Sequence, residues 1–99
     1  MRPSDPEHDP VVHDLRERIT DADRAILAAV NERIELVREL RAHKLANDWD
    51  FVDRDREERL LATLLSENTG PLSEAGLREL FGDVLALTKR ELREPGATP

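Results

Sequence analysis

The sequence predicts an all-α fold with three helices per chain, one long and two shorter. Hydrophobic residues make up 38% of its 99 residues, charged residues 37% and aromatic residues only 3%, a profile typical of a small helical protein with a leucine-rich core. Apolar residues recur three or four positions apart in three segments, as they do on one face of a helix. Clusters of loop-forming residues separate these segments, and the length favours a single domain.

The first segment predicts a long helix from about Val12 to Leu45 or Ala46. Its apolar stripe comprises Leu15, Ile19, Ala22, Ile26, Ala29, Val30, Val37 and Leu40. The run Asn47-Asp48-Trp49-Asp50 then favours a loop. Upstream, prolines lie among charged residues, so residues 1–11 are expected to form a disordered tail.

Two shorter helices are expected downstream. The second begins near Asp53, with Asp53 or Asp55 as its N-cap, and continues to about Ser66. Gly70-Pro71 follows, where glycine suits a left-handed position and proline cannot continue a helix.

The third helix is expected to run from Ser73, its N-cap, to about Arg93. The folded domain would then span residues 12–93, and residues 94–99 would form a second disordered tail.

Composition and motifs disfavour several classes of protein. The net charge of −7 argues against a nucleic-acid binder, which needs a basic face. The chain has no cysteine, its three histidines lack metal-like spacing, and it has neither a nucleophile triad nor a glycine-rich phosphate loop. No stretch is apolar enough to span a membrane and no signal-peptide core is recognisable, so a cytoplasmic protein is expected. An enzyme of this kind would work without metal or cofactor, by positioning an anionic substrate and stabilising developing charge.

Polar residues occupy positions that should be apolar. Arg33 and Lys44 lie within roughly 20° of each other in the middle of the first stripe, and no acid shares that stripe. Glu57, with Arg56 at its edge, faces the apolar side of the second helix, and Thr88 lies in the stripe of the third. Because a buried charge needs a partner, these residues indicate either an internal salt-bridge network, such as Arg33 or Lys44 with Glu57, or a dianionic ligand held between helices.

The length of the first helix predicts a homodimer. A helix of about 33 residues is roughly 50 Å long, whereas a compact chain of this size is only about 33 Å across. Two shorter helices cannot cover its whole apolar stripe, and no proline or glycine lies within it to kink it. Pairing of long helices from two chains would cover the stripe.

The same residues carry a family resemblance. The segment 15–23, Asn31-Glu32-Arg33, Lys44 eleven positions later, and Asp53-Arg54-Asp55-Arg56-Glu57 resemble the all-helical (AroQ-type) chorismate mutases. Asn68-Thr69-Gly70-Pro71-Leu72 is similar to the junction between the second and third helices of several bacterial members, and the resemblance covers about residues 12–93.

This resemblance implies an intertwined homodimer with two active sites and an isomerase activity. The family converts chorismate to prephenate, at the branch of the shikimate pathway towards phenylalanine and tyrosine, by a Claisen rearrangement that needs no acid, base, metal or cofactor. By position, Arg33 would bind one carboxylate of the substrate, and Arg16 would reach into the partner's site and bind the other. Lys44 would donate to the ether oxygen, where negative charge grows as the carbon–oxygen bond breaks.

The remaining positions that match the family have supporting roles. Arg56 would help to order the carboxylate, Glu57 and the backbone near Asp53 would hold the ring hydroxyl, and Thr88 matches a serine that often contacts a carboxylate. Arg16 is implied by the resemblance alone, since it lies about 100° off the stripe of its own helix.

One position departs from the family pattern. Leu92 stands where a glutamine or glutamate usually makes the second contact to the ether oxygen, and the adjacent Glu91 would reach the site only after a register shift. Loss of such a donor costs about 10²–10³ in rate, or ~3–4 kcal/mol. We therefore expect a mutase that is weak alone or completed by a partner, such as the 3-deoxy-heptulosonate-phosphate synthase that activates some short members of the family.

Three alternatives stay open at the level of sequence. The chain could act on a close analogue, as an isochorismate–pyruvate lyase or an amino-deoxychorismate mutase, which fold analogy cannot separate. It could be a weakly active regulatory dimer that binds a pathway metabolite or enzyme, or a structural bundle in which Arg33 and Lys44 are neutralised internally. Trp49 and Phe51 are expected to cover the core or, alternatively, to gate the site.

Overall fold

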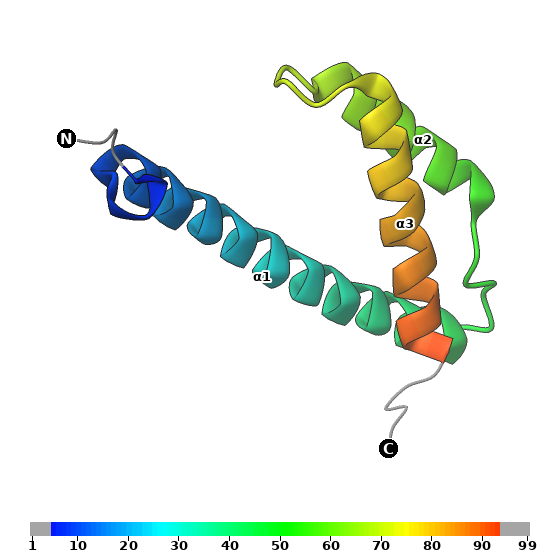
Figure 1. The fold of residues 1–99 in the computed structure, drawn as a ribbon. Helices are drawn as coiled ribbons and strands as arrows, with labels where there is room; N and C mark the ends of the chain where they lie inside the picture. The colour runs from blue at the N-terminus through cyan, green and yellow to red at the C-terminus, as the bar shows by residue number, and fades with distance from the viewer. Residues whose placement is uncertain (1–4, 94–99) are drawn as a thin grey trace. The chain divides into compact units, whose positions relative to one another are not determined.

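The computed structural model describes residues 5–93, and all regular structure in this part of the chain is helical (Figure 1). A short 3₁₀-helix, η1 (Pro6–His8), precedes α1 (Pro10–Ala46), α2 (Arg54–Glu67) and α3 (Glu74–Arg93). The predicted all-α class, with one long and two shorter helices, is confirmed. The tails expected at residues 1–4 and 94–99 lie outside the described residues.

α1 begins at Pro10, two residues before the expected start at Val12. The carboxylate of Asp9 accepts hydrogen bonds from the backbone N–H groups of Val11 (2.7 Å) and Val12 (3.2 Å), which caps the helix. Pro10 fits the first helical position because that position needs no N–H donor. Residues 5–11 therefore comprise the cap Asp5, η1, the connecting Asp9 and the first two residues of α1, so this part of the segment expected as a tail is largely helical.

A short loop follows α1, as Asn47–Asp50 predicted. The side-chain amide of Asn47 donates to the His43 carbonyl at 2.9 Å, and the Trp49 N–H donates to the Lys44 carbonyl at 2.8 Å. Between them Asp48 has a φ of 58°, a left-handed conformation that asparagine and aspartate adopt more readily than other non-glycine residues. The polar groups of the loop thus satisfy carbonyl oxygens in the last turn of α1.

Caps set the start of the two shorter helices. Asp53 accepts a hydrogen bond from the Arg56 N–H at 3.0 Å, as predicted for α2. Ser73 accepts one from the Gly76 N–H at 2.9 Å at the start of α3. A methyl group at Gly76 would lie only 2.9 Å from Leu72 Cδ1, so Leu72 packs closely over the first turn of α3.

The chain divides into two compact units, at Met1–Glu32 and Arg33–Pro99, and α1 crosses the boundary. In the first unit the large apolar side chains of α1 are mostly exposed, including Ile19 and Ile26 at 60% and 61%. In the second unit α2 and α3 pack together. Among the described residues the buried core consists of Leu77 and Leu92 with the polar Thr88.

Candidate active site

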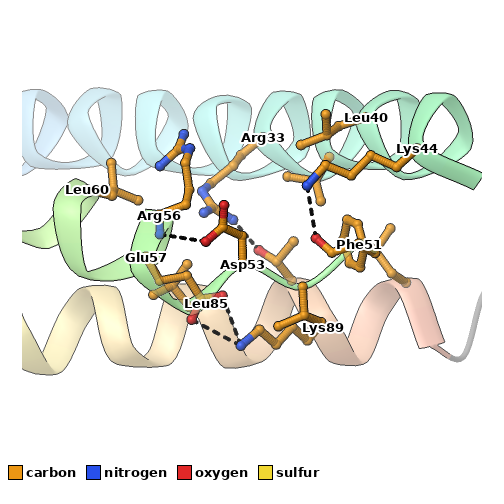
Figure 2. Close-up of a pocket in the computed structure, with 14 residues that line it drawn as sticks. Arg33, Leu40, Lys44, Phe51, Asp53, Arg56, Glu57, Leu60, Leu85 and Lys89 are labelled. Atoms are coloured by element: carbon orange, nitrogen blue, oxygen red, sulfur yellow. Dashed lines mark hydrogen bonds and ion pairs between the residues drawn. The ribbon is translucent and has the colours of Figure 1, made fainter. Parts of the chain in front are cut away.

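The second unit contains a pocket of about 340 Å³ between the C-terminal part of α1, the loop, α2 and α3 (Figure 2). Its volume falls within the range of small-molecule sites. One part of the lining is polar and comprises Arg33, Lys44, Asp53, Arg56, Glu57, Thr88 and Lys89. The rest is apolar and comprises Val37, Leu40, Phe51, Val52, Leu60, Leu85 and Leu92. Most of the residues predicted for the site therefore lie around one cavity.

A hydroxyl group, and not a carboxylate, is the hydrogen-bond partner of Arg33. Its guanidinium donates to Thr88 Oγ1 at 2.6 Å, and Thr88 in turn donates to the Val84 carbonyl at 2.8 Å. The pKa of Arg33 is lowered, chiefly because burial removes water and also because Arg56 lies nearby, while Glu57 raises it. Arginine stays charged in proteins, so this lowered pKa means that the cation lacks full stabilisation in the pocket.

Lys44 is a second cation in the pocket lining. Its Nζ donates to the Phe51 carbonyl at 3.2 Å, which ties the end of α1 to the loop before α2. Within residues 5–93 neither Arg33 nor Lys44 has a carboxylate at salt-bridge distance. The interpretation in which one of these cations pairs with Glu57 is therefore wrong for the described chain.

The partner of Glu57 is Lys89, a residue that the sequence reasoning missed. Lys89 Nζ lies 3.0 Å from Oε2 and 3.2 Å from Oε1 of Glu57, which links α3 to α2 (Figure 2). The available signal was its helical position, four residues after Leu85 and three before Leu92, both of which line the pocket. A lysine at these spacings faces the same side as the two leucines.

The pocket carries an excess of positive charge. Four of its lining side chains are cationic and two are carboxylates, Asp53 and Glu57. The carboxylate of Asp53 is also engaged as the cap of α2. The lining therefore has a net charge of two positive units in a partly enclosed site, and this charge favours binding of a small dianion.

α3 presents Leu92 to the pocket, and not Glu91. Leu92 is 5% exposed and lines the cavity, whereas Glu91 is exposed and does not line it. The register shift considered for Glu91 is therefore not observed. The wall of the pocket at this position is apolar.

The other predicted residues lie apart from the polar lining. Arg16 belongs to the first unit, where it is exposed and lies 3.9 Å from a carboxylate oxygen of Glu7. Its insertion into a partner's site stays a prediction. Phe51 is half-buried and lines the pocket, but Trp49 is 57% exposed and packs edge-on against His43, with ring centroids 5.7 Å apart. Trp49 thus does not cover the core of this chain.

Two further properties concern the described residues as a group. Residues 5–93 contain no cluster of three or more histidine and acidic side chains placed to hold a metal ion. None of their helices combines the length and the apolarity that crossing a membrane requires.

The class of structure that these residues define is an all-helical fold with a small cationic pocket between its helices. Comparison with protein families narrows this class: the family model for chorismate mutase type II matches residues 15–92. Because the match covers most of the chain, the protein belongs to the chorismate mutase type II family. Comparisons with curated proteins and with solved structures gave no match.

Proposed function

We propose that the chain is a chorismate mutase, a cytoplasmic isomerase that converts chorismate to prephenate for phenylalanine and tyrosine synthesis without a cofactor. The observation that carries this proposal is the convergence of Arg33, Lys44, Arg56 and Glu57 on one pocket with two excess positive charges. The match to the chorismate mutase type II family supports the substrate class. Chorismate carries two carboxylates, which suit that excess charge.

The carboxylates of the substrate would be bound by arginines. Arg33 is held by Thr88 and has no carboxylate at salt-bridge distance within residues 5–93, so a substrate carboxylate would supply the stabilisation that burial removes. Arg56 would help to orient this carboxylate from α2. The second carboxylate would be bound by Arg16 of a second copy, which is exposed in the single chain. Two fixed carboxylates hold the substrate in the compact conformer that reacts.

Lys44 would stabilise the transition state. As the carbon–oxygen bond breaks and the carbon–carbon bond forms, negative charge grows on the ether oxygen, and a positioned ammonium favours that state over the ground state. Glu57 and the backbone near Asp53 would bind the ring hydroxyl at the other end of the substrate. No proton is transferred in this rearrangement, so catalysis rests on electrostatics and on selection of the reactive conformer.

The active unit would be a homodimer. Among the described residues only Leu77 and Leu92 form a buried apolar core, which is too small for a stable isolated chain. The exposed apolar residues of α1 include Val11, Leu15, Ile19, Ile26 and Leu27. Pairing of two such helices would cover them and place Arg16 near a second pocket.

The first test is turnover of chorismate by the purified protein, followed by loss of absorbance, with prephenate identified by acid conversion to phenylpyruvate. Arg33→Ala should lower kcat/KM by about 10²–10³ or more, with a retained helical circular-dichroism spectrum. Arg41→Ala, an exposed arginine of the same helix outside the pocket lining, is the matched control. Isochorismate and the amino analogue should be converted poorly, and preference for either would assign the related lyase or mutase instead.

The apolar wall at Leu92 favours one second candidate, a weakly active regulatory dimer that acts with another enzyme. With Lys44 as the one donor to the ether oxygen, we expect the isolated protein to turn over below about 10 s⁻¹, the median for enzymes. Addition of 3-deoxy-heptulosonate-phosphate synthase should then raise kcat. Chorismate binding without turnover, both alone and with the synthase, would favour a purely regulatory binder.

A further inference from the structure

We propose that Lys89 is a positioning residue that holds the Glu57 carboxylate in the pocket and thereby sets recognition of the hydroxyl-bearing end of the ligand. This inference rests on the proposed function, because it names the group that Glu57 would bind. It concerns a residue that touches Glu57 and acts through it.

The geometry of the Lys89–Glu57 pair is unlike that of the other ion pairs. Within residues 5–93 it is the only ion pair that joins two of the three α-helices, whereas the others are local or connect α1 to η1. Its side chains are 40% and 28% exposed, while both partners of every other pair are at least 52% exposed. Exposed pairs contribute little, but a partly shielded pair is screened less by water and salt.

The pair also lies between two cavities. Glu57 and Lys89 line the active-site pocket on one side, and on the other they line a second hollow between α2 and α3. The other charged side chains that line this second hollow are Arg54, Arg78 and Glu58, two cations and one carboxylate. Glutamate has three rotatable bonds. Without Lys89, the carboxylate of Glu57 could therefore turn out of the active-site pocket into the second hollow, where there is room and where Arg54 and Arg78 could bind it.

Lys89 also limits how Glu57 acts on the cations inside the pocket. The carboxylate of Glu57 is within electrostatic reach of Arg33, whose pKa it raises. An unrestrained Glu57 could therefore neutralise the guanidinium that a substrate carboxylate needs. Lys89 contacts both oxygens of Glu57, yet a carboxylate has about four lone-pair positions. Acceptor sites remain for a ligand hydroxyl.

A purely structural role for the pair makes different predictions. If Lys89 only fastens α3 to α2, its loss should lower the unfolding temperature and weaken all ligands alike. If Lys89 positions Glu57, its loss should weaken the ligands that carry the ring hydroxyl and leave the others unchanged. A pair of dicarboxylate inhibitors shaped like chorismate, one with the ring hydroxyl and one without it, separates these roles.

The experiment uses the full chain, with synthase present if turnover requires it, and compares Lys89→Met, Lys89→Arg and the exposed neighbour Arg90→Met. Lys89→Met should weaken the hydroxylated inhibitor by about tenfold or more, the usual worth of a hydrogen bond to a charged group, and leave the deoxy inhibitor within about twofold. Lys89→Arg should restore most of the binding. Arg90→Met should match wild type, because Arg90 is exposed and does not line the pocket.

A double variant keeps the inference testable if Lys89→Met is unstable alone. In a Glu57→Gln background, Lys89→Met should have little further effect on the hydroxylated inhibitor, since the positioned group is already lost. Equal weakening of both inhibitors by Lys89→Met would overturn the role of Lys89, and so would effects of Lys89→Met and Glu57→Gln on binding free energy that are fully additive. Turnover of chorismate by the wild type would still support the proposed function in either case. A wild type that neither binds the dicarboxylates nor converts chorismate would overturn both.

Discussion

Thr88 holds the guanidinium of Arg33 through a neutral group. Its hydroxyl donates to the Val84 carbonyl within α3, so its lone pairs are left to accept from Arg33. The guanidinium is therefore fixed by a neutral acceptor, which orients the cation without neutralising it. A carboxylate at the same place would orient Arg33 equally well but compete with an anionic ligand.

Replacement of Thr88 by valine tests this orientation. Thr88→Val removes the acceptor, leaves the Arg33 donor unpaired at a cost of about 1–3 kcal/mol, and should raise KM for chorismate by about tenfold. Thr88→Ser retains the hydroxyl and should stay close to wild type. Steady-state kinetics on the two variants decides the point, and an unchanged KM in Thr88→Val would contradict it.

Leu92 gives a prediction in the opposite direction, a gain of activity. Leu92→Gln would place an amide donor in the wall where Lys44 otherwise acts alone, so kcat should rise, by up to about 10²–10³ if the geometry is favourable. The change buries a polar group, and the unfolding free energy should fall by about 1–3 kcal/mol. Leu85→Gln, another wall position of the same pocket, should cost stability without raising kcat.

The candidate site was largely predictable from anomalies in helical periodicity. Arg33, Lys44, Glu57 and Thr88 stood out because each breaks an apolar stripe, and all four line one pocket. Their partners were not predictable, because a helical pattern gives the face of a residue but not which neighbour lies opposite it. The Lys89–Glu57 pair spans 32 positions and depends on how α2 and α3 pack, a tertiary property.

At the scale of single elements, caps explain where the helices begin and end. Ser73 was predicted as the cap of α3 and Asp53 or Asp55 as the cap of α2, and Asp53 and Ser73 accept the expected backbone hydrogen bonds. α1 begins two residues before the expected start, because prolines among charges are typical of a tail and do not reveal the cap in front of the helix. Asp9 in fact supplies a cap, and Pro10 opens the helix.

The end of α1 depends on the left-handed Asp48. A β-branched residue is strained in this conformation, so Asp48→Val should destabilise the protein by about 1–2 kcal/mol. Asp50→Val, in the same loop but outside the left-handed position, should have a much smaller effect. Thermal unfolding of both variants provides the comparison, and equal unfolding temperatures would show that Asp48 carries no special constraint.

At the scale of the whole molecule, stability should depend on protein concentration. The described chain buries few apolar side chains and exposes many along α1, so folding and association should be coupled. The unfolding temperature should rise as the concentration is raised, and sedimentation should give twice the mass of the 11.3 kDa chain. A concentration-independent transition of a monomer would contradict the proposed dimer.

A charge introduced on the exposed apolar face of α1 also tests the proposed dimer. Ile26→Glu should be nearly neutral in a monomer, because Ile26 is 61% exposed there, but in a dimer it should prevent association and abolish activity. Arg24→Glu, on the exposed surface of the same helix, is the control and should leave the dimer intact. Analytical ultracentrifugation of the two variants gives the answer directly.

The hydrogen bond from Lys44 to the Phe51 carbonyl has a consequence for when Lys44 would contribute to the proposed reaction. The ammonium already has an acceptor in the loop, so substrate binding at the proposed site would exchange one oxygen acceptor for another. Such an exchange contributes little to ground-state affinity, since the bond gained replaces a bond lost. In the proposed reaction the gain would come later, when the ether oxygen becomes more negative than a peptide carbonyl and competes better for the ammonium as hydrogen-bond donor. The Phe51 carbonyl would then compete with the substrate's ether oxygen for the ammonium in the ground state, and the ether oxygen would become the better acceptor only in the transition state.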